Sequence, residues 1–232
     1  MKAAIMQPYF FPYIGYFQLM AAVDLFVIYD NIKYTKKGWI NRNRILLNGR
    51  DTPFTLPLKS ASDFLDLRER EVPVDFDRGK LVNQLRGAYA KAPHFKQMFP
   101  MLEEILRYPE ANLFKYLENS IAQTCDIIGI TTKIVASSTV AIDHQLKSQD
   151  KVIALCQALQ AQTYINAIGG MELYSKDEFR ARGIELRFIR SQTFEYPQFG
   201  AEFVPWLSIV DVLMFNTLDV VREAIRSRYE LI

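Results

Sequence analysis

The sequence predicts an α/β fold with a doubly wound, mostly parallel sheet of the Rossmann-like kind and an inserted helical lobe. Three observations favour this class. Short apolar runs recur along the chain, segments with apolar residues at helical spacing separate them, and loops with glycine, proline or polar residues follow several runs. The runs expected to be strands are 2–6, 24–30, 132–138, 163–167 and 184–189.

Composition indicates one domain that spans residues 1–232. Half of the residues are apolar and 13% are aromatic, which is enough for a packed core. A net charge of +2 argues against a general polyanion binder, so we expect no nucleic acid as a partner. Cys125 and Cys156 lack metal-ligand spacing and the chain has two histidines, so we predict no metal site. Polar residues and prolines interrupt the apolar N-terminal stretch, so we expect no membrane span and a cytoplasmic protein.

The first elements form a strand, a helix and a strand. Residues 2–6 are an apolar run that ends at Gln7-Pro8, residues 13–23 have helical character despite a glycine, and 24–30 is a second strand-like run. This order is typical of a βαβ unit, whose two strands are parallel. Residues 42–58 then read as a β-hairpin around the turn dipeptide Asn48-Gly49.

A helical insertion is expected over about 70–130, and Gly129 is suited to end its last helix. Beyond it, strand and helix alternate again, with a helix predicted over 148–161. The last 25 residues, which begin "SIVDVLMFN", are predicted to be helical.

Ligands of doubly wound sheets bind at the carboxyl ends of strands, where the strand order reverses. Three stretches follow predicted strands: 7–16, 30–44 and 166–174. We therefore expect the aromatic turn "QPYFFPYIGY" and the cationic segment "KKGWINRNR" to face one cleft. In the turn, Gln7 could fix a polar edge of a ligand, although a stiff, well-packed turn would also explain these residues.

The cationic segment has two interpretations. If it is extended, one face carries Trp39 with two amides, and the other carries Ile40 with two guanidinium groups. An aromatic ring with amides and cations is a common way to hold a nucleotide sugar. A strand whose cations only block edge pairing is the alternative. The candidate substrate-binding residues are Lys37, Trp39, Asn41, Arg42, Asn43 and Arg44.

The remaining candidates come from the second half of the chain and from the second strand. Gly169-Gly170 could allow close approach of a phosphate, or could form only a turn. Ser208 is expected to cap a helix. Asp211 lies in an apolar helix, where a buried carboxylate needs a partner; a structural ion pair and a ligand for a substrate amine both fit. Further candidates are Tyr196 and Gln198 as binding residues and Asp30, with Asp211, as an acid–base group. The sequence carries no conventional nucleophile elbow, phosphate loop or dinucleotide fingerprint.

Several stretches, in this order, resemble the WbqC-like family of bacterial proteins. They are "QPYFFPYIGYF", "DLFVIYDNIKYTKKGWINRNRI", "FTLPL", "YINAIGGMELY", "YPQF" and "FVPWLSIVDVLMFN". The resemblance spans nearly the whole chain and implies a role in lipopolysaccharide O-antigen gene clusters and in the modification of sugar nucleotides. A fainter likeness is to nucleotidyl-transfer folds such as pantothenate synthetase. Their histidine signature for ATP is replaced here by Tyr13 and Tyr16, and this departure argues against ATP, which is kept only as an open cofactor. The likeness is one of fold and implies a nucleotidyltransferase-like sheet. Tyr13 and Tyr16 remain candidate substrate-binding residues.

Taken together, the residues and the resemblance predict an enzyme that modifies a nucleotide-linked amino sugar, by adding glycine or another small acyl group to the sugar amine. The partners are then the nucleotide sugar and an acyl or amino-acid donor. Arginine and lysine would neutralise the diphosphate, Trp39 would stack on base or sugar, and Asp211 or Asp30 would receive the amine proton. The alternative is a non-catalytic sugar-nucleotide or glycan binder, and a homodimer is left open.

Overall fold

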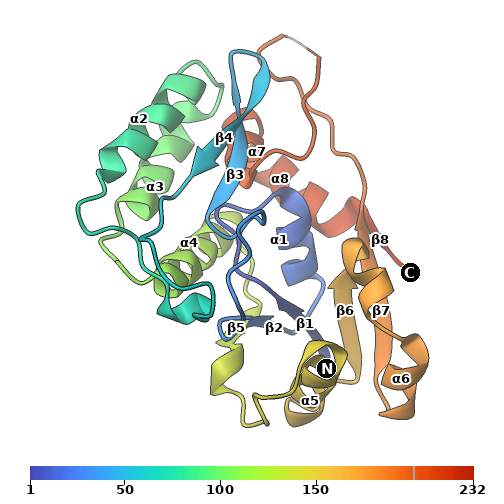
Figure 1. The fold of residues 1–232 in the computed structure, drawn as a ribbon. Helices are drawn as coiled ribbons and strands as arrows, with labels where there is room; N and C mark the ends of the chain where they lie inside the picture. Colours follow the sequence, from blue (N-terminus) through green and yellow to red (C-terminus); the bar gives the residue numbers. More distant parts are fainter. Residues whose placement is uncertain (201) are drawn as a thin grey trace.

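A six-stranded sheet forms the centre of the computed structural model, which describes residues 1–200 and 202–232 (Figure 1). The strand order is β5-β2-β1-β6-β7-β8, and the first five strands are parallel to their neighbours while β8 is antiparallel to β7. The α/β class and the mostly parallel sheet predicted from the sequence are confirmed. The strands are β1 (Lys2–Met6), β2 (Leu25–Ile28), β5 (Lys133–Ala136), β6 (Thr163–Ala167), β7 (Glu185–Ser191) and β8 (Tyr229–Leu231).

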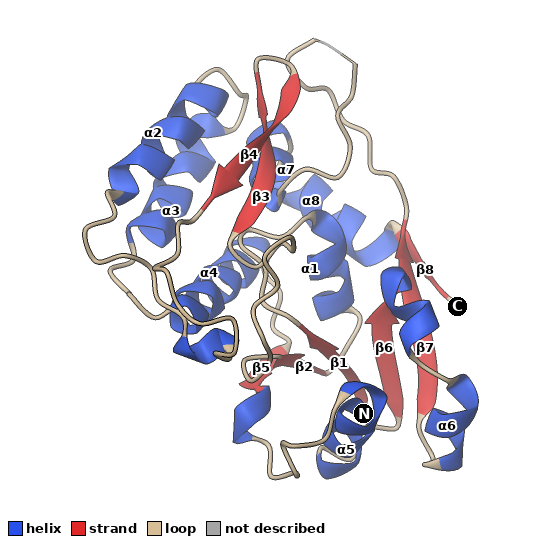
Figure 2. Ribbon diagram, viewed as in Figure 1, coloured by secondary structure: helices blue, strands red, loops and turns tan. Residues whose placement is uncertain are grey.

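Helices cover both faces of this sheet, as Figure 2 shows. Successive strand residues point to opposite faces, so Ala4 and Phe26 join the core under α1, α4 and α8, while Ala3 and Val27 join the core under α5 and α6. β1, β2 and β6 are buried on both faces, and their sequences are therefore mainly apolar runs, whereas β7 alternates exposed charged residues with buried apolar ones. The helices are α1 (Ile14–Ala21), α4 (Leu113–Ile128), α8 (Leu218–Ser227), α5 (Ser148–Ala158) and α6 (Lys176–Ala181).

The strand order reverses between β1 and β6. From β1 the chain proceeds outward through β2 to β5, and it then returns to the other side of β1 to form β6 and β7. The carboxyl ends of β1 and β6 therefore flank the point at which a doubly wound sheet binds its ligands.

The end of the chain differs from the prediction of a purely helical segment. It contains α7 (Ile209–Phe215) and α8, and then β8, which pairs with β7. Backbone hydrogen bonds of 2.9 Å run in both directions between Phe188 and Ile232. A three-residue strand is too short to show an alternating pattern, so the sequence offers no periodic signal for it.

The rest of the chain packs beside the sheet. β3 (Arg42–Leu47) and β4 (Arg50–Thr55) form an antiparallel hairpin, and Asn48 and Gly49 at its tip both have positive φ. Two further helices, α2 (Arg78–Tyr89) and α3 (Phe95–Arg107), pack on each other, and α3 also packs on α7. Gly129, with φ of 85°, ends α4 in the left-handed conformation. Short 3₁₀ helices are η1 (Leu67–Glu69), η2 (Ser137–Thr139) and η3 (Ile168–Leu173). Within the described ranges, no helix has the length and apolar character needed to cross a membrane.

Candidate functional site

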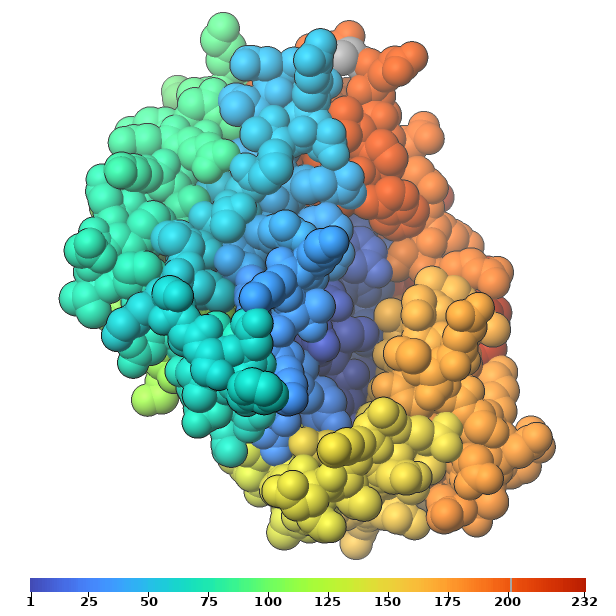
Figure 3. Space-filling model, viewed as in Figure 1, coloured from blue at the N-terminus to red at the C-terminus, as the bar shows by residue number. Residues whose placement is uncertain are grey.

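A cavity of about 460 Å³ opens at the carboxyl ends of β1 and β6. Figure 3 shows this hollow, with dark blue atoms of the N-terminal segment as its floor. The loop before β3 forms one wall, the start of η3 another, and the segment that leads to α7 a third. The lining residues are Met6, Tyr9, Tyr13, Gly15, Tyr16, Leu19, Trp39, Asn43, Arg44, Ala167, Ile168, Gly169, Ser191 and Trp206.

Two buried polar side chains hold the aromatic turn that forms the floor. The Asn43 amide donates hydrogen bonds to the carbonyl oxygens of Phe10 (3.0 Å) and Phe11 (2.8 Å). The Ser208 hydroxyl donates to the Phe11 carbonyl at 2.7 Å. The Ser208 hydroxyl oxygen also accepts a hydrogen bond from the Val210 backbone N–H at the start of α7. Phe11 has φ of 41°, which is an uncommon conformation for a bulky residue. Asn43 and Ser208 therefore stabilise the turn from below, and of these two only Asn43 lines the cavity.

Gly15 allows the floor to close tightly. A Cβ atom at this position would collide with the Tyr13 ring and with the Ser191 hydroxyl oxygen. Burial raises the pKa of Tyr13, so its phenol is neutral at pH 7 and can donate a hydrogen bond. Tyr16 is buried, and its hydroxyl donates to the Gln7 carbonyl oxygen at 3.0 Å. Gln7 itself lies outside the cavity lining.

Among the described residues that line the cavity, Arg44 carries the one positively charged side chain. Its guanidinium lies 5.5 Å from the centre of the Trp39 ring, donates to Asp51 Oδ2 at 2.9 Å and to the Trp206 carbonyl at 3.3 Å. Trp39 is 40% exposed and Trp206 is 41% exposed, so both indoles are open to solvent at the cavity. Arg44 thus connects the two walls that carry the tryptophans. Salt bridges of this exposure contribute little to stability, so Asp51 restrains Arg44 only weakly.

The segment before Arg42 forms turns and bends rather than an extended strand, and β3 begins at Arg42. The Arg42 side chain donates to the carbonyl oxygens of Gly38 (3.0 Å) and Lys37 (2.7 Å) and so closes its own loop. Asn41 donates to the Leu56 carbonyl and accepts from the Tyr34 hydroxyl, both at 2.7 Å. Lys37, Asn41 and Arg42 therefore lie outside the cavity lining, whereas Trp39 and Arg44 meet in it.

Asp211 is fully buried beneath the wall that carries Trp206. Its Oδ1 accepts from the Tyr89 hydroxyl at 2.8 Å, and its Oδ2 accepts from the Tyr196 hydroxyl (2.6 Å) and the Gln198 amide (2.8 Å). The partners are thus phenols and an amide, not the arginine or lysine expected for an ion pair. Burial raises the pKa of Asp211, against the opposing effect of these three hydrogen bonds. Asp211, Tyr196 and Gln198 fix the chain that leads to Trp206 without lining the cavity.

Asp30 lies at the carboxyl end of β2 in a separate polar cluster. Its carboxylate accepts from the Ser138 backbone at 2.8 Å and from the Ser138 hydroxyl at 2.5 Å, and the Ser137 hydroxyl is 2.8 Å from Oδ1. The neighbouring Lys151 is buried and donates to the Asn31 carbonyl oxygen at 3.2 Å, and burial lowers its pKa. Asp30 therefore joins the ends of β2 and β5 and does not line the cavity.

The two glycines of the third stretch differ. Gly169 lines the cavity and has open space where a Cβ would stand. Gly170 packs against the Asn166 side chain, where a Cβ would collide with the amide nitrogen. The group that lies close to the Gly170 backbone is thus the Asn166 side chain, whereas the sequence analysis considered a phosphate there.

The structure brings together six of the candidate residues from three distant stretches of sequence. They are Tyr13, Tyr16, Trp39, Asn43, Arg44 and Gly169. Sequence reasoning did not assign Tyr9, Ser191 or Trp206 to the site. Ser191 ends β7, so the rule that ligands gather at strand ends could have identified it. Within the described ranges, no cluster of three or more histidine, cysteine, aspartate or glutamate side chains could hold a metal ion.

Comparison with known proteins identifies the family. The sequence model of the WbqC-like protein family matches residues 7–223. The chain is 30% identical over 221 residues to the uncharacterized protein Rv1507c of Mycobacterium tuberculosis, and the alignment covers 93% of each chain. No solved structure matches the chain significantly. The family match covers the turn, the cationic segment and both tryptophans, and the chain belongs to the WbqC-like protein family.

Proposed function

We propose that this protein binds a nucleotide-linked amino sugar in the cavity between β1 and β6 and acylates its amino group, as a step in the assembly of lipopolysaccharide O-antigen precursors. The observation that carries the proposal is the cavity itself: its aromatic walls, the Arg44 guanidinium at its rim and its place where the strand order reverses. Its volume of about 460 Å³ lies within the range of ligand sites, roughly 300–1,000 Å³.

In this proposal the diphosphate binds near the rim, at Arg44. A guanidinium forms paired hydrogen bonds with phosphate oxygens, and the bridge to Asp51 is exposed enough to exchange for them. Trp39 and Trp206 offer ring faces to the base or to the sugar. The apolar side chains of Met6 and Leu19 contact the less polar part of the ligand.

The chemistry is attack of the sugar amine on an activated acyl carbon. A C–N bond forms, the bond from the acyl carbon to its leaving group breaks, and the leaving group departs with the electron pair of that bond. The amine proton passes to the leaving group, so atoms and charges balance. Tyr13, as a neutral phenol, is suited to donate a hydrogen bond to the carbonyl oxygen as negative charge develops on it. Asp30 and Asp211 do not line the cavity, so in this proposal neither contacts the substrate. Asp211 supports the wall beside the cavity, and Asp30 belongs to the separate cluster at β2 and β5.

The second candidate function is a sugar-nucleotide binder without catalysis. It is favoured by the cavity lining, in which the described residues include no carboxylate, histidine or cysteine that could serve as a conventional acid, base or nucleophile.

One experiment separates the two functions. The protein is mixed with UDP- or dTDP-linked amino sugars and with glycine plus ATP or an acyl thioester, and the products are measured by mass spectrometry, while binding is measured by calorimetry. Acylation of the sugar that is lost in Arg44→Ala supports the enzyme. Binding without any gain in mass supports the binder, and absence of binding contradicts both.

A further inference from the structure

The cavity between β1 and β6 changes in character from its rim to its floor. At the rim, the Arg44 guanidinium contacts both Trp39 and Trp206, and both indoles are partly exposed. The floor contains Met6, the last residue of β1, and Leu19 of α1, which is buried. Packing of the sheet explains apolar residues at these positions, but a core side chain contacts other protein atoms, whereas these two line an open cavity. The floor can therefore hold an apolar part of a ligand.

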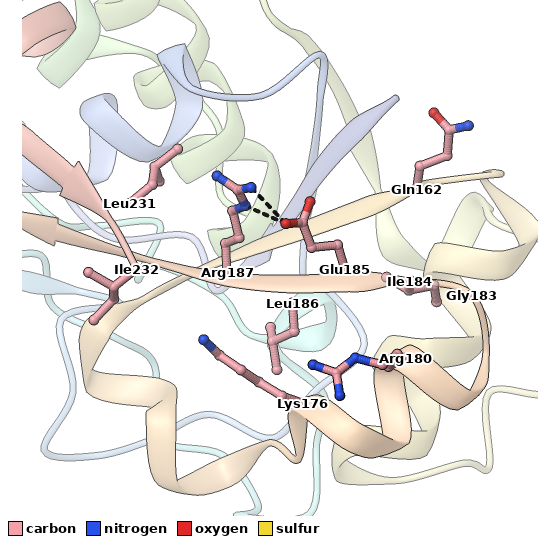
Figure 4. A pocket seen from close by; sticks show the side chains of 10 residues that line it. All are labelled: Gln162, Lys176, Arg180, Gly183, Ile184, Glu185, Leu186, Arg187, Leu231 and Ile232. Carbon is pink, nitrogen blue, oxygen red and sulfur yellow. Dashed lines mark hydrogen bonds and ion pairs between the residues drawn. The ribbon is translucent and has the colours of Figure 1, made fainter.

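A second cavity, of about 530 Å³ along β7, has a lining of the opposite kind. Figure 4 shows the charged side chains that surround it, and Glu185 and Arg187 form a salt bridge of 2.7 Å on one side of the strand. Lys176 and Arg180 also line it, so both signs of charge are present there. Scarcity of charge is thus a property of the cavity between β1 and β6 and not of every hollow on this protein.

Two polar side chains deep in the cavity between β1 and β6 are already used by the protein itself. The Asn43 amide donates to two carbonyl groups of the turn, and its oxygen accepts from the Arg44 backbone N–H at 2.9 Å. The Tyr16 hydroxyl proton is directed to the Gln7 carbonyl oxygen. A ligand in the floor therefore finds neither an amide hydrogen of Asn43 nor the phenol proton of Tyr16 free to bind it.

The other lining hydroxyl groups are uncharged. Burial raises the pKa of Tyr9 and of Tyr13, so both phenols are neutral at pH 7, and the Ser191 hydroxyl is neutral as well. An aromatic face can also attract a cation, but the Trp39 ring already has the Arg44 guanidinium 5.5 Å from its centre. The described part of the lining thus offers no negative charge and repels a further cation near the rim.

This lining discriminates between acyl groups by their charge. A glycyl group carries an amino group that is largely protonated at pH 7. In the floor that ammonium would lose its hydration without meeting a carboxylate from the described lining residues, and burial of an unpaired charge is strongly unfavourable. An alkyl chain of the same reach has no such cost and gains free energy by leaving water.

We propose that the floor of this cavity binds an uncharged alkyl chain, and that in the acylation this chain belongs to the acyl group, supplied as the thioester of an alkanoic acid. The sugar amine attacks the thioester carbon and an amide bond forms. The C–S bond breaks with its electron pair on sulfur, and the amine proton passes to that sulfur to give a thiol. The transfer rests on the proposed function, whereas the preference of the floor for an alkyl chain is measured by binding alone.

The binding test uses the full chain and ethyl, butyl, hexyl and octyl phosphate, which combine a phosphate for Arg44 with chains of increasing length. The two tryptophans of the chain are Trp39 and Trp206, and both line the cavity, so intrinsic fluorescence reports binding there. Each added methylene group is expected to lower the dissociation constant about threefold to fourfold until the floor is filled. The probe 6-aminohexyl phosphate, with an ammonium at the end of its chain, is expected to bind at least tenfold more weakly than hexyl phosphate.

A variant that fills the floor gives an independent measurement. Ala167→Leu adds bulk to a lining residue at the end of β6 and is expected to weaken binding of hexyl phosphate at least tenfold, while ethyl phosphate changes less than twofold. Ala158→Leu, at the exposed end of α5, is the matched control and is expected to leave both unchanged. Circular dichroism checks the fold, and the comparison of hexyl with 6-aminohexyl phosphate on the unaltered protein requires no variant.

Transfer is then measured by mass spectrometry with a nucleotide-linked amino sugar and equal amounts of hexanoyl and glycyl thioesters. Preferential transfer of hexanoyl supports the inference. Preferential transfer of glycyl overturns it and leaves the proposed acylation standing, whereas dependence of binding on chain length without any transfer supports the alkyl-binding floor and contradicts the acylation. Equal binding of hexyl and 6-aminohexyl phosphate, or an affinity independent of chain length, overturns the inference whatever the transfer assay shows.

Discussion

The hydrogen-bond network around Asp211 makes a sharp prediction about stability. All three partners donate to the carboxylate: the Tyr89 hydroxyl, the Tyr196 hydroxyl and the Gln198 amide. The Tyr89 hydroxyl accepts a hydrogen bond from the Leu46 backbone N–H, so its own proton is directed to Asp211. This arrangement fits the ionised carboxylate, which only accepts. Tyr196→Phe removes the 2.6 Å bond and leaves the ring packing in place. Because a hydrogen bond to a charged group contributes about 1.5–3 kcal/mol, we expect the free energy of unfolding at pH 8 to fall by that amount.

The assay is urea unfolding followed by circular dichroism, because tryptophan fluorescence would also report local changes at Trp206. Tyr108→Phe is the matched control: its ring packs on Tyr116, and its hydroxyl makes no hydrogen bond within the described residues. We expect the control to change stability by less than about 0.5 kcal/mol. Equal losses in Tyr196→Phe and Tyr108→Phe would refute the assignment of Asp211 as a buried anion held by its donors.

The pH dependence of the same network has a definite sign. Burial raises the pKa of Asp211 in the folded protein, whereas an aspartate in the unfolded chain titrates near about 3.9. The folded state therefore binds this proton more tightly, and its contribution to stability falls as the pH rises from about 4 through the folded-state pKa. Asp211→Asn removes this titration. The stability of the wild type minus that of the variant is expected to decrease over that range, and a constant or increasing difference would contradict the raised pKa.

The remaining predictions concern the cavity between β1 and β6. Arg44→Ala is expected to raise the dissociation constant of a nucleotide sugar about tenfold or more, measured by calorimetry, while Arg50→Ala on the exposed hairpin leaves it unchanged. Gly15→Ala is expected to lower the free energy of unfolding by about 1–3 kcal/mol in urea, because the added methyl group collides with the Tyr13 ring; an unchanged midpoint would contradict the tight floor. Asn43→Ala leaves the Phe10 carbonyl group without its side-chain donor and removes one of two donors to the Phe11 carbonyl group, so a loss of about 1–3 kcal/mol is expected in the same assay.

The fold followed from local patterns in the sequence. Strands that are buried on both faces have mainly apolar sequences, so β1, β2 and β6 could be located from the local sequence alone. The strand β8 could not, since its three residues become a strand only by pairing with β7. Its position depends on tertiary contacts such as the hydrogen bonds from Gln18 to the end of α8, which no local pattern encodes.

The candidate site was predictable as a region but not as a set of side chains. The rule for strand ends correctly selected the stretches that meet, because strand order and direction are topological properties. The roles of Arg42 and Arg44 could not be separated from the sequence. They are two residues apart on one strand face, yet Arg42 binds the carbonyl groups of its own loop, and Arg44 reaches the cavity. Which of the two reaches the cavity depends on the turns before β3, where the chain does not have the extended conformation that the alternating arrangement assumed.

The two supporting networks explain why so many polar residues surround a cavity with few polar groups of its own. Asn43 and Ser208 satisfy the carbonyl groups of the turn below the cavity, and Asp211 fixes the tyrosine and glutamine of the wall beside it. A ligand that contacts Trp206 therefore binds to a wall whose position depends on a buried carboxylate. Binding and stability are linked through that carboxylate, so Tyr196→Phe should weaken ligand binding even though Tyr196 lines no part of the cavity. If Tyr196→Phe loses stability but retains full affinity for the nucleotide sugar, then the wall at Trp206 is positioned by other contacts.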